Sequence, residues 1–132
     1  MKSTINHIQI NVSDKNISFP FYKELLSFLG FAIVHEDEQT LGMSNGSSDI
    51  WLGQTDDRFI STPFHRKHTG LNHIAFKVDS KEGIDLFSRE FLQKKGIKTL
   101  YSSPKAFPEY TPDYYAVFFE DPDRVKLEVV FL

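Results

Sequence analysis

The sequence predicts an α+β fold built from two tandem copies of one βαβββ module. Residues 5–12 resemble residues 71–78, which lie about half the length of the 132-residue chain further along. Both segments contain the tripeptide Asn-His-Ile. A self-similar segment at such a separation indicates a duplicated folding unit. In both halves a helical pattern follows this segment and ends at a glycine, Gly30 or Gly96, and short β-rich segments come next.

The first module begins with a strand and a helix. Residues 4–12 alternate between apolar and polar side chains, which is typical of a strand. Residues 14–16 form a turn and capping region, and Pro20 is expected in the first helical turn, where its missing N–H costs nothing. Asn45-Gly46 is a strong hairpin signal. The expected elements are a strand at 4–12, a helix at 17–29, a strand at 31–36 and a hairpin of strands at 39–44 and 48–54.

The second module repeats this order. Asp79 and Glu82 have the spacing of a capping box at a helix start. Residues 102–113 contain three prolines and predict an ordered loop. The expected elements are a strand at 71–78, a helix at 80–95, a strand at 97–101 and a hairpin of strands at 114–120 and 125–132. We expect one domain over 1–132, with modules at 1–54 and 71–132 and a linker or flap at 55–70.

The composition narrows the class of protein. With 132 residues, 40% of them hydrophobic, the chain is large enough for one domain with a packed core. A net charge of −3 and scattered basic residues argue against a nucleic-acid partner. The absence of cysteine excludes disulfides and thiolate metal sites. Because no signal peptide or membrane-length apolar run is present, we expect a cytoplasmic protein with no membrane partner.

Three polar side chains are expected on the sheet faces that the helices leave uncovered. Strand alternation directs Ile8 and Ile10 toward the first helix and His7 to the other face. The same alternation places His73 and Glu128 on the corresponding faces of the second module. Two imidazole nitrogens and one carboxylate are a common catalytic metal set that leaves positions open for water or substrate. One divalent metal ion is therefore expected on His7, His73 and Glu128, with Zn, Ni, Mn and Fe(II) about equally suited to these ligands.

Four groups of motifs are shared with a known superfamily. They are Asn-His-Ile at 6–8, Phe-Tyr at 21–22 with Leu-Gly-Phe at 29–31, Leu-Asn-His-Ile-Ala-Phe at 71–76, and the most specific stretch, 114–128. In them the chain resembles the vicinal-oxygen-chelate superfamily of glyoxalase I, bleomycin-resistance proteins, fosfomycin-resistance enzymes and extradiol dioxygenases. This resemblance, over essentially the whole chain, implies an open, incomplete barrel and a divalent metal on the three residues above. It also implies a small-molecule substrate or ligand and a homodimer.

The chain departs from the patterns of individual branches of this superfamily. By the internal repeat, Trp51 takes the position equivalent to Glu128, where glyoxalase I enzymes carry a glutamate as fourth ligand and base. Tryptophan can do neither, so the usual glyoxalase I reaction is not expected. Extradiol dioxygenases usually have tyrosine at the position of Phe118 and glycine or proline at that of Arg124. Fosfomycin transferases carry threonine at the position of Gln9 and a potassium-binding loop that this chain lacks.

Further side chains are candidates for the substrate site. Gln9 and Tyr115 are candidates for a catalytic role, and Trp51 is either a substrate platform or a core residue. The tyrosines at 110, 114 and 115 could supply a proton or a hydrogen bond, although a tyrosine on a strand usually packs. The histidines at 35, 65 and 68 are expected to be exposed. The candidate substrate-binding residues are Gln9, Asn11, Trp51, Lys77, Tyr110 and Tyr115.

The favoured function is a metal-dependent enzyme of lyase, isomerase or transferase type. Its substrate would be small and would chelate the metal through two neighbouring oxygens. The alternatives are a non-enzymatic protein that sequesters an antibiotic-type ligand, an extradiol-type dioxygenase, and a structural or regulatory domain with a vestigial site. The sequence leaves open the substrate, and also whether the two modules pair within one chain or swap across a dimer.

Overall fold

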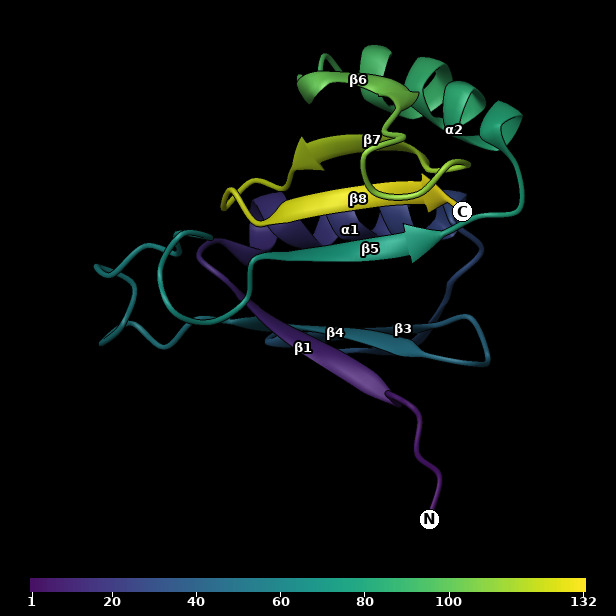
Figure 1. Cartoon of the computed structure of the whole chain (residues 1–132). Coiled ribbons are helices and arrows are strands. Elements are labelled where there is room, and N and C mark those ends of the chain that lie inside the picture. The colour runs from purple at the N-terminus through teal and green to yellow at the C-terminus, as the bar shows by residue number, and fades with distance from the viewer. The chain divides into compact units, whose positions relative to one another are not determined.

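A computed structural model describes residues 1–132 and confirms the α+β class (Figure 1). The chain divides into two compact units, Met1–Pro63 and Phe64–Leu132, each with one four-stranded mixed sheet. Neither sheet closes on itself. No helix in the structure is long and apolar enough to cross a membrane.

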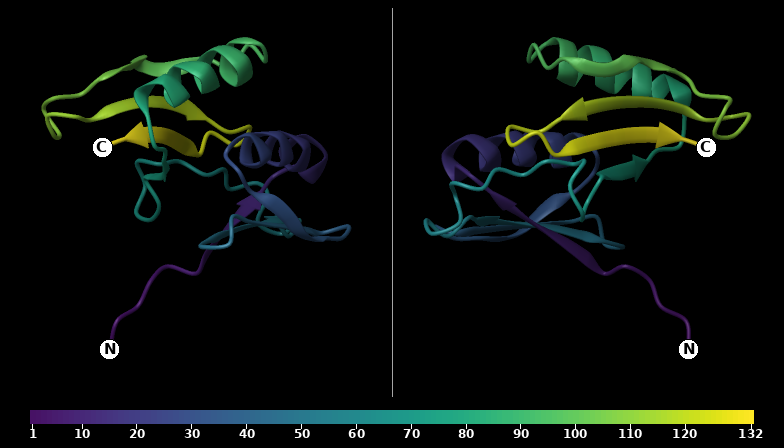
Figure 2. Two further views of the ribbon diagram at one scale, coloured as in Figure 1. Left: turned by 90° about the vertical axis from the view of Figure 1, so that its right-hand side faces the viewer. Right: turned by 60° about the vertical axis from the view of Figure 1, so that its left-hand side comes forward.

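The first unit follows the predicted order of elements. Its sheet has the strand order β1-β4-β3-β2, in which β1 runs parallel to β4 and the other pairs are antiparallel. The helix contacts β2, β3 and β4 and lies along one face of this sheet (Figure 2). The elements are β1 (His7–Val12), α1 (Lys15–Phe28), β2 (Ala32–Glu36), β3 (Thr40–Ser44) and β4 (Asp49–Gln54).

The start of α1 differs from the expectation. Asp14 is the N-cap, and its side chain accepts a hydrogen bond from the Asn16 backbone N–H at 2.9 Å. The helix therefore begins at Lys15, two residues earlier than predicted, and Pro20 lies in its second turn rather than its first. The end was predicted correctly, because Gly30 follows the helix with a φ of +85°, a backbone conformation that favours glycine.

The second unit repeats the topology. Its sheet has the order β5-β8-β7-β6, with β5 parallel to β8, and α2 contacts β7 and β8. The predicted helix at 80–95 is divided into an α-helix and a short π-helical segment. The elements are β5 (His73–Lys77), α2 (Lys81–Phe87), η1 (Ser88–Gln93), β6 (Thr99–Ala106), β7 (Tyr115–Glu120) and β8 (Lys126–Phe131).

Two predictions for the second unit were wrong. Ser80 rather than Asp79 caps α2, and its hydroxyl accepts a hydrogen bond from the Gly83 backbone N–H at 3.1 Å. Residues 102–106, predicted as loop, belong to β6, whose pairing with β7 shifts register between Leu100 and Lys105. Ser103 bridges this irregularity: its hydroxyl donates to the Leu100 carbonyl at 2.6 Å and accepts from the Phe118 N–H at 3.0 Å.

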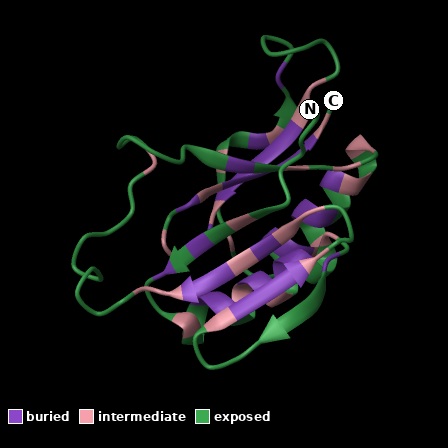
Figure 3. Cartoon of the chain, turned by 90° about the horizontal axis from the view of Figure 1, so that it is seen from below, coloured by how far each residue is buried: buried purple, intermediate pink, exposed green.

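Each unit has its own hydrophobic core between sheet and helix. In the first, Tyr22, Leu25 and Leu26 of α1 are fully buried. In the second, Phe87 packs on Phe119 with ring centroids 5.5 Å apart. Figure 3 shows that buried positions concentrate on strands and helices. The opposite face of the second sheet is consequently free to carry polar side chains.

Candidate metal and substrate site

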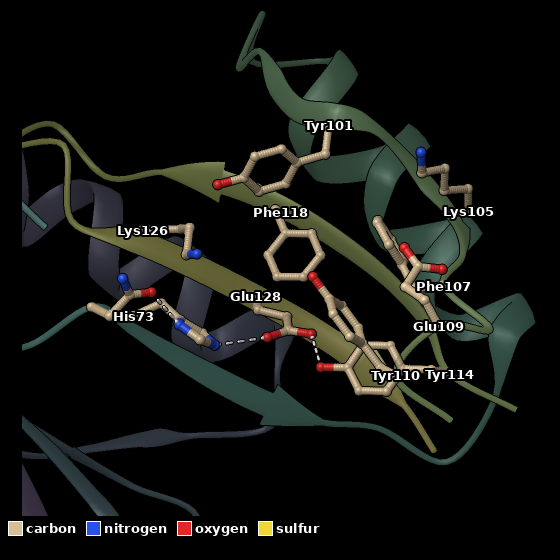
Figure 4. A pocket seen from close by; sticks show the side chains of 11 residues that line it. His73, Tyr101, Lys105, Phe107, Glu109, Tyr110, Tyr114, Phe118, Lys126 and Glu128 are labelled. Atoms are coloured by element: carbon tan, nitrogen blue, oxygen red, sulfur yellow. Dashed lines mark hydrogen bonds and ion pairs between the residues drawn. The ribbon is translucent and has the colours of Figure 1, made fainter. Parts of the chain in front are cut away.

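The second unit contains a cavity of about 720 Å³ on the sheet face turned away from α2 (Figure 4). Phe118 and Glu128 occupy directly opposed positions of β7 and β8 and both line it. Most of the apolar lining is aromatic, and these residues come from β6, β7 and the segment between them. They are Tyr101, Phe107, Tyr110, Tyr114 and Phe118.

The structure brings two of the predicted metal ligands together. The register pairs Ala75 of β5 with Glu128 of β8. His73 precedes Ala75 by two residues and shares its face of β5, so its side chain can reach the carboxylate of Glu128 diagonally. His73 Nε2 is 3.2 Å from Glu128 Oε2. The Glu128 side chain is only 1% exposed, whereas that of His73 is 36% exposed. The carboxylate is therefore buried and the imidazole reaches it from the open side of the cavity.

The hydrogen bond at His73 Nδ1 determines which ring nitrogen of the neutral imidazole carries the proton. The Asn72 side-chain oxygen lies 2.8 Å from His73 Nδ1, and because that oxygen only accepts, Nδ1 carries the proton. In the neutral ring Nε2 then presents a lone pair toward Glu128 Oε2. That oxygen is buried without a hydrogen-bond partner, because its approach to Nε2 has ion-pair distance but not hydrogen-bond geometry. Two facing acceptors need a cation between them, either a proton on the imidazole or a metal ion.

These two residues fit a divalent metal. Ligands at roughly 2.0–2.1 Å from a tetrahedral ion lie about 3.3 Å apart, close to the 3.2 Å separation of His73 Nε2 and Glu128 Oε2. The hydrogen bond from Nδ1 to Asn72 is also the usual way in which a metal-ligating imidazole is oriented. His73 and Glu128 could thus supply one nitrogen and one oxygen ligand.

Tyr114 holds the other oxygen of the carboxylate. Its hydroxyl donates a hydrogen bond to Glu128 Oε1 at 2.5 Å. Burial, and then this hydrogen bond, raise the pKa of Tyr114 well above its ordinary value, so the phenol stays a donor. Sequence reasoning left Tyr114 between packing and chemistry. Its spacing from Phe118 places both on one face of the strand predicted at 114–120, a signal that could have singled it out.

The first unit reproduces the Asn-His arrangement without the carboxylate. The Asn6 side-chain oxygen accepts from His7 Nδ1 at 2.8 Å, so His7 likewise presents Nε2. His7, Gln9 and Asn11 alternate on the exposed face of β1. Within neither unit do three histidine, cysteine, aspartate or glutamate side chains gather as a metal site. The assignment of His7 as the third ligand therefore stays a prediction.

Trp51 takes the position that the internal repeat assigned to it. Gln9 of β1 pairs with Trp51 of β4, as Ala75 of β5 pairs with Glu128 of β8. The half-buried indole lies over its cross-strand neighbour Gly42, where a Cβ atom would come within 2.8 Å of the ring. The tryptophan thus fills the space at this position of the first unit.

The remaining candidates divide between the cavity and other surfaces. Tyr110 lines the cavity. Lys77 is exposed and does not line it. The Tyr115 hydroxyl donates to Asp85 Oδ1 of α2 at 2.7 Å, on the helix side of the sheet, so the structure does not bring this catalytic candidate to the cavity. That hydrogen bond and burial raise the pKa of Tyr115 to about 12.

Sequence reasoning missed several residues of the cavity wall. Lys126 could have been predicted from strand alternation, because it precedes Glu128 by two positions on β8 and therefore shares its face. Tyr101, Lys105, Phe107 and Glu109 had no such signal, since most of their segment was predicted as loop and its strand is interrupted.

The comparisons with known proteins agree with this fold. The model of the Glyoxalase/Bleomycin resistance protein/Dioxygenase superfamily matches residues 4–129, and the chain belongs to this superfamily. Its relatives include the uncharacterized protein YqjT of Bacillus subtilis, 33% identical over 126 residues that span 96% of this chain and 97% of that protein. The metallothiol transferase FosB of Staphylococcus epidermidis is 27% identical over 130 residues, which span 96% of this chain and 80% of that protein.

Solved structures give the same classification. The crystal structure of a glyoxalase candidate from Bacillus halodurans superposes with a TM-score of 0.90 at 36% identity, covering 99% of this chain and 97% of that one. The fosfomycin resistance protein FosX of Listeria monocytogenes has a TM-score of 0.71 at 18% identity, covering 100% and 95%, and shows likeness of fold alone.

Proposed function

We propose that the protein is a metal-dependent enzyme that acts on a small substrate with two neighbouring oxygens. His73, Glu128 and His7 are the proposed ligands. The observation that carries this proposal is the buried Glu128 Oε2, which lacks a hydrogen-bond partner and faces His73 Nε2 at 3.2 Å. When bound, a divalent ion would act as a Lewis acid on the substrate oxygens.

Other residues of this chain would prepare the site. Asn72 orients the imidazole of His73, and Tyr114 holds Glu128 so that its second oxygen points toward that imidazole. The aromatic wall would exclude water from a bound substrate. Gln9 remains a candidate for contacting substrate from the first unit.

Among the possible reaction types, we propose group transfer. Four relatives named metallothiol transferase FosB align over 95–98% of the chain at 25–27% identity. Gln9 stands where the resemblance expects threonine in fosfomycin transferases. The proposed substrate is therefore a different small oxygen-bearing molecule.

A titration with acetohydroxamate, which chelates metals through two neighbouring oxygens, tests this proposal. The protein is stripped with chelator, reloaded in turn with Zn, Ni and Mn, and titrated in a calorimeter. We expect binding to metal-loaded protein and none to stripped protein. We also expect the His73→Ala variant to bind neither metal nor acetohydroxamate, and His65→Ala, which alters an exposed histidine, to behave as wild type. Equal metal uptake by wild type and His73→Ala would contradict the proposal.

A second candidate function is the sequestering of a small ligand without catalysis. The aromatic lining of the cavity favours it, since such walls bind flat apolar molecules without any metal. The two functions differ in their response to chelator. Ligand binding that survives complete metal removal would support sequestration.

A further inference from the structure

We propose that the cavity of the second unit takes a small organic anion with a flat, aromatic body, whose acid group binds the ammonium of Lys126. This inference rests on the proposed function in that the same molecule would be the substrate. The geometry of Lys126 and its neighbours carries it.

Lys126 has no carboxylate partner in the structure, although one stands opposite it. Its cross-strand neighbour on β7 is Glu120. Glu120 is instead engaged by two arginines: Arg66 pairs with Oε1, and Arg124 Nε lies 3.4 Å from Oε2. The Lys126 ammonium does not pair with Glu120. It lies instead 5.6 Å from the ring centroids of both Tyr101 and Phe118. Cation–π contacts of this kind leave the N–H donors of the ammonium available to a ligand.

The ammonium of Lys126 lies close to the candidate metal site. Register pairs Lys126 with His73, and Lys126 precedes Glu128 on the same face of β8. Figure 4 shows the ammonium directed into the cavity on the side of His73 and Phe118. An acid group on Lys126 would therefore lie next to the two proposed metal ligands.

The cavity wall carries further charged side chains besides Lys126. Lys105 lies 5.0 Å from the Phe107 ring centroid and adds a second cation, while Glu109 and Glu128 are the anions. Glu128 already faces His73 and accepts from Tyr114, which leaves exposed Glu109 as the opposing charge. Because the wall between these charges is aromatic, a flat hydrocarbon body fits the cavity better than an extended polar chain.

Binding of phenylphosphonate, followed by NMR titration of the full chain, tests the inference. Benzoate shows whether a carboxylate serves as well as a phosphonate, neutral benzamide removes the charge, and methylphosphonate removes the ring. We expect the two aromatic anions to bind more tightly than benzamide and methylphosphonate. Lys126→Gln should weaken phenylphosphonate binding about ten-fold or more, as expected for loss of a charge-assisted contact, and leave benzamide binding unchanged.

Two further variants keep the result interpretable. Lys126→Arg retains the charge and should retain binding, and Lys98→Gln removes an exposed charge outside the cavity and should have no effect. Equal affinity of wild type and folded Lys126→Gln for phenylphosphonate, or tighter binding of benzamide than of the anions, overturns the inference.

Metal content measured on the same samples separates this inference from the proposed function. Protein that takes up no metal contradicts the proposed function but leaves the Lys126→Gln comparison intact. Metal-loaded protein with no Lys126→Gln effect overturns the inference alone.

Discussion

A buried carboxylate is costly unless both of its oxygens are matched. In Glu128 the two oxygens have different environments: Oε1 accepts from Tyr114, and Oε2 faces His73 without a hydrogen bond. The first contact stabilises the ionised side chain inside the protein. The second leaves a lone pair that a cation can use, which is the physical basis of the proposed metal site.

Replacement of Tyr114 by phenylalanine should therefore weaken both the fold and the metal site. Loss of a hydrogen bond to a buried charged group costs about 1.5–3 kcal/mol. Loss of a group that orients a ligand lowers metal affinity by roughly ten-fold or more. Denaturant unfolding and metal calorimetry measure the two effects. The control is Tyr110→Phe, which keeps the ring of a cavity tyrosine whose hydroxyl makes no hydrogen bond. Equal effects of the two substitutions would show that the Tyr114 hydroxyl has no special role.

At the scale of elements, predictions succeeded where the local signal agreed with the final structure. Gly30 and Gly96 have positive φ values, as helix-ending glycines do, and residues 45–48 connect an antiparallel strand pair. Only the start of β6 was predicted, because residues 102–106 were expected to form a loop. Its strand continues through an irregularity at Tyr101 and Ser102, whose φ values are positive, and tertiary hydrogen bonds of Ser103 support it. Such contacts leave no periodic pattern in the sequence.

The packing of β3 on β4 predicts a sharp steric effect at Gly42. A Cβ atom there would lie 2.8–2.9 Å from three carbons of the Trp51 ring. Gly42→Ala should therefore destabilise the protein by about 1–3 kcal/mol in denaturant unfolding. Gly53→Ala is the matched control on β4, since its Cβ would meet only the side-chain ends of Gln9, at 3.2 Å, and Asn11, at 3.6 Å. A Gly42→Ala cost no larger in wild type than in a Trp51→Leu background would contradict this explanation.

The contact between β7 and α2 predicts a pH dependence. The pKa of Tyr115 is raised to about 12 in the folded state, from 10.0, chiefly by its hydrogen bond to Asp85. Because the folded pKa is the higher one, this contact stabilises fully below about pH 10, and its stabilisation is lost as pH rises through about 12. Tyr115→Phe should cost about 1 kcal/mol at neutral pH. Unfolding measurements at several pH values should show the difference from wild type shrinking above pH 10; a constant difference would refute it.

At the scale of the whole molecule, duplication explains both what the two units share and how they differ. The equivalence of Trp51 and Glu128 was predicted from the repeat, and the two strand registers confirm it. At this strand position only the second unit therefore carries a carboxylate. The repeat could not reveal the cavity, since much of its wall comes from residues 101–110, which have no recognisable counterpart in the first unit. The contribution of His7 and the homodimer stay predictions.

Elemental analysis of the purified protein tests the metal site most directly. Protein reloaded with a divalent metal and freed of excess ions should contain one ion per chain. His7→Ala, His73→Ala and Glu128→Gln should each lose most of it, while His65→Ala should retain it. Full metal content in His73→Ala or Glu128→Gln, or no metal in the wild-type protein, would contradict the account.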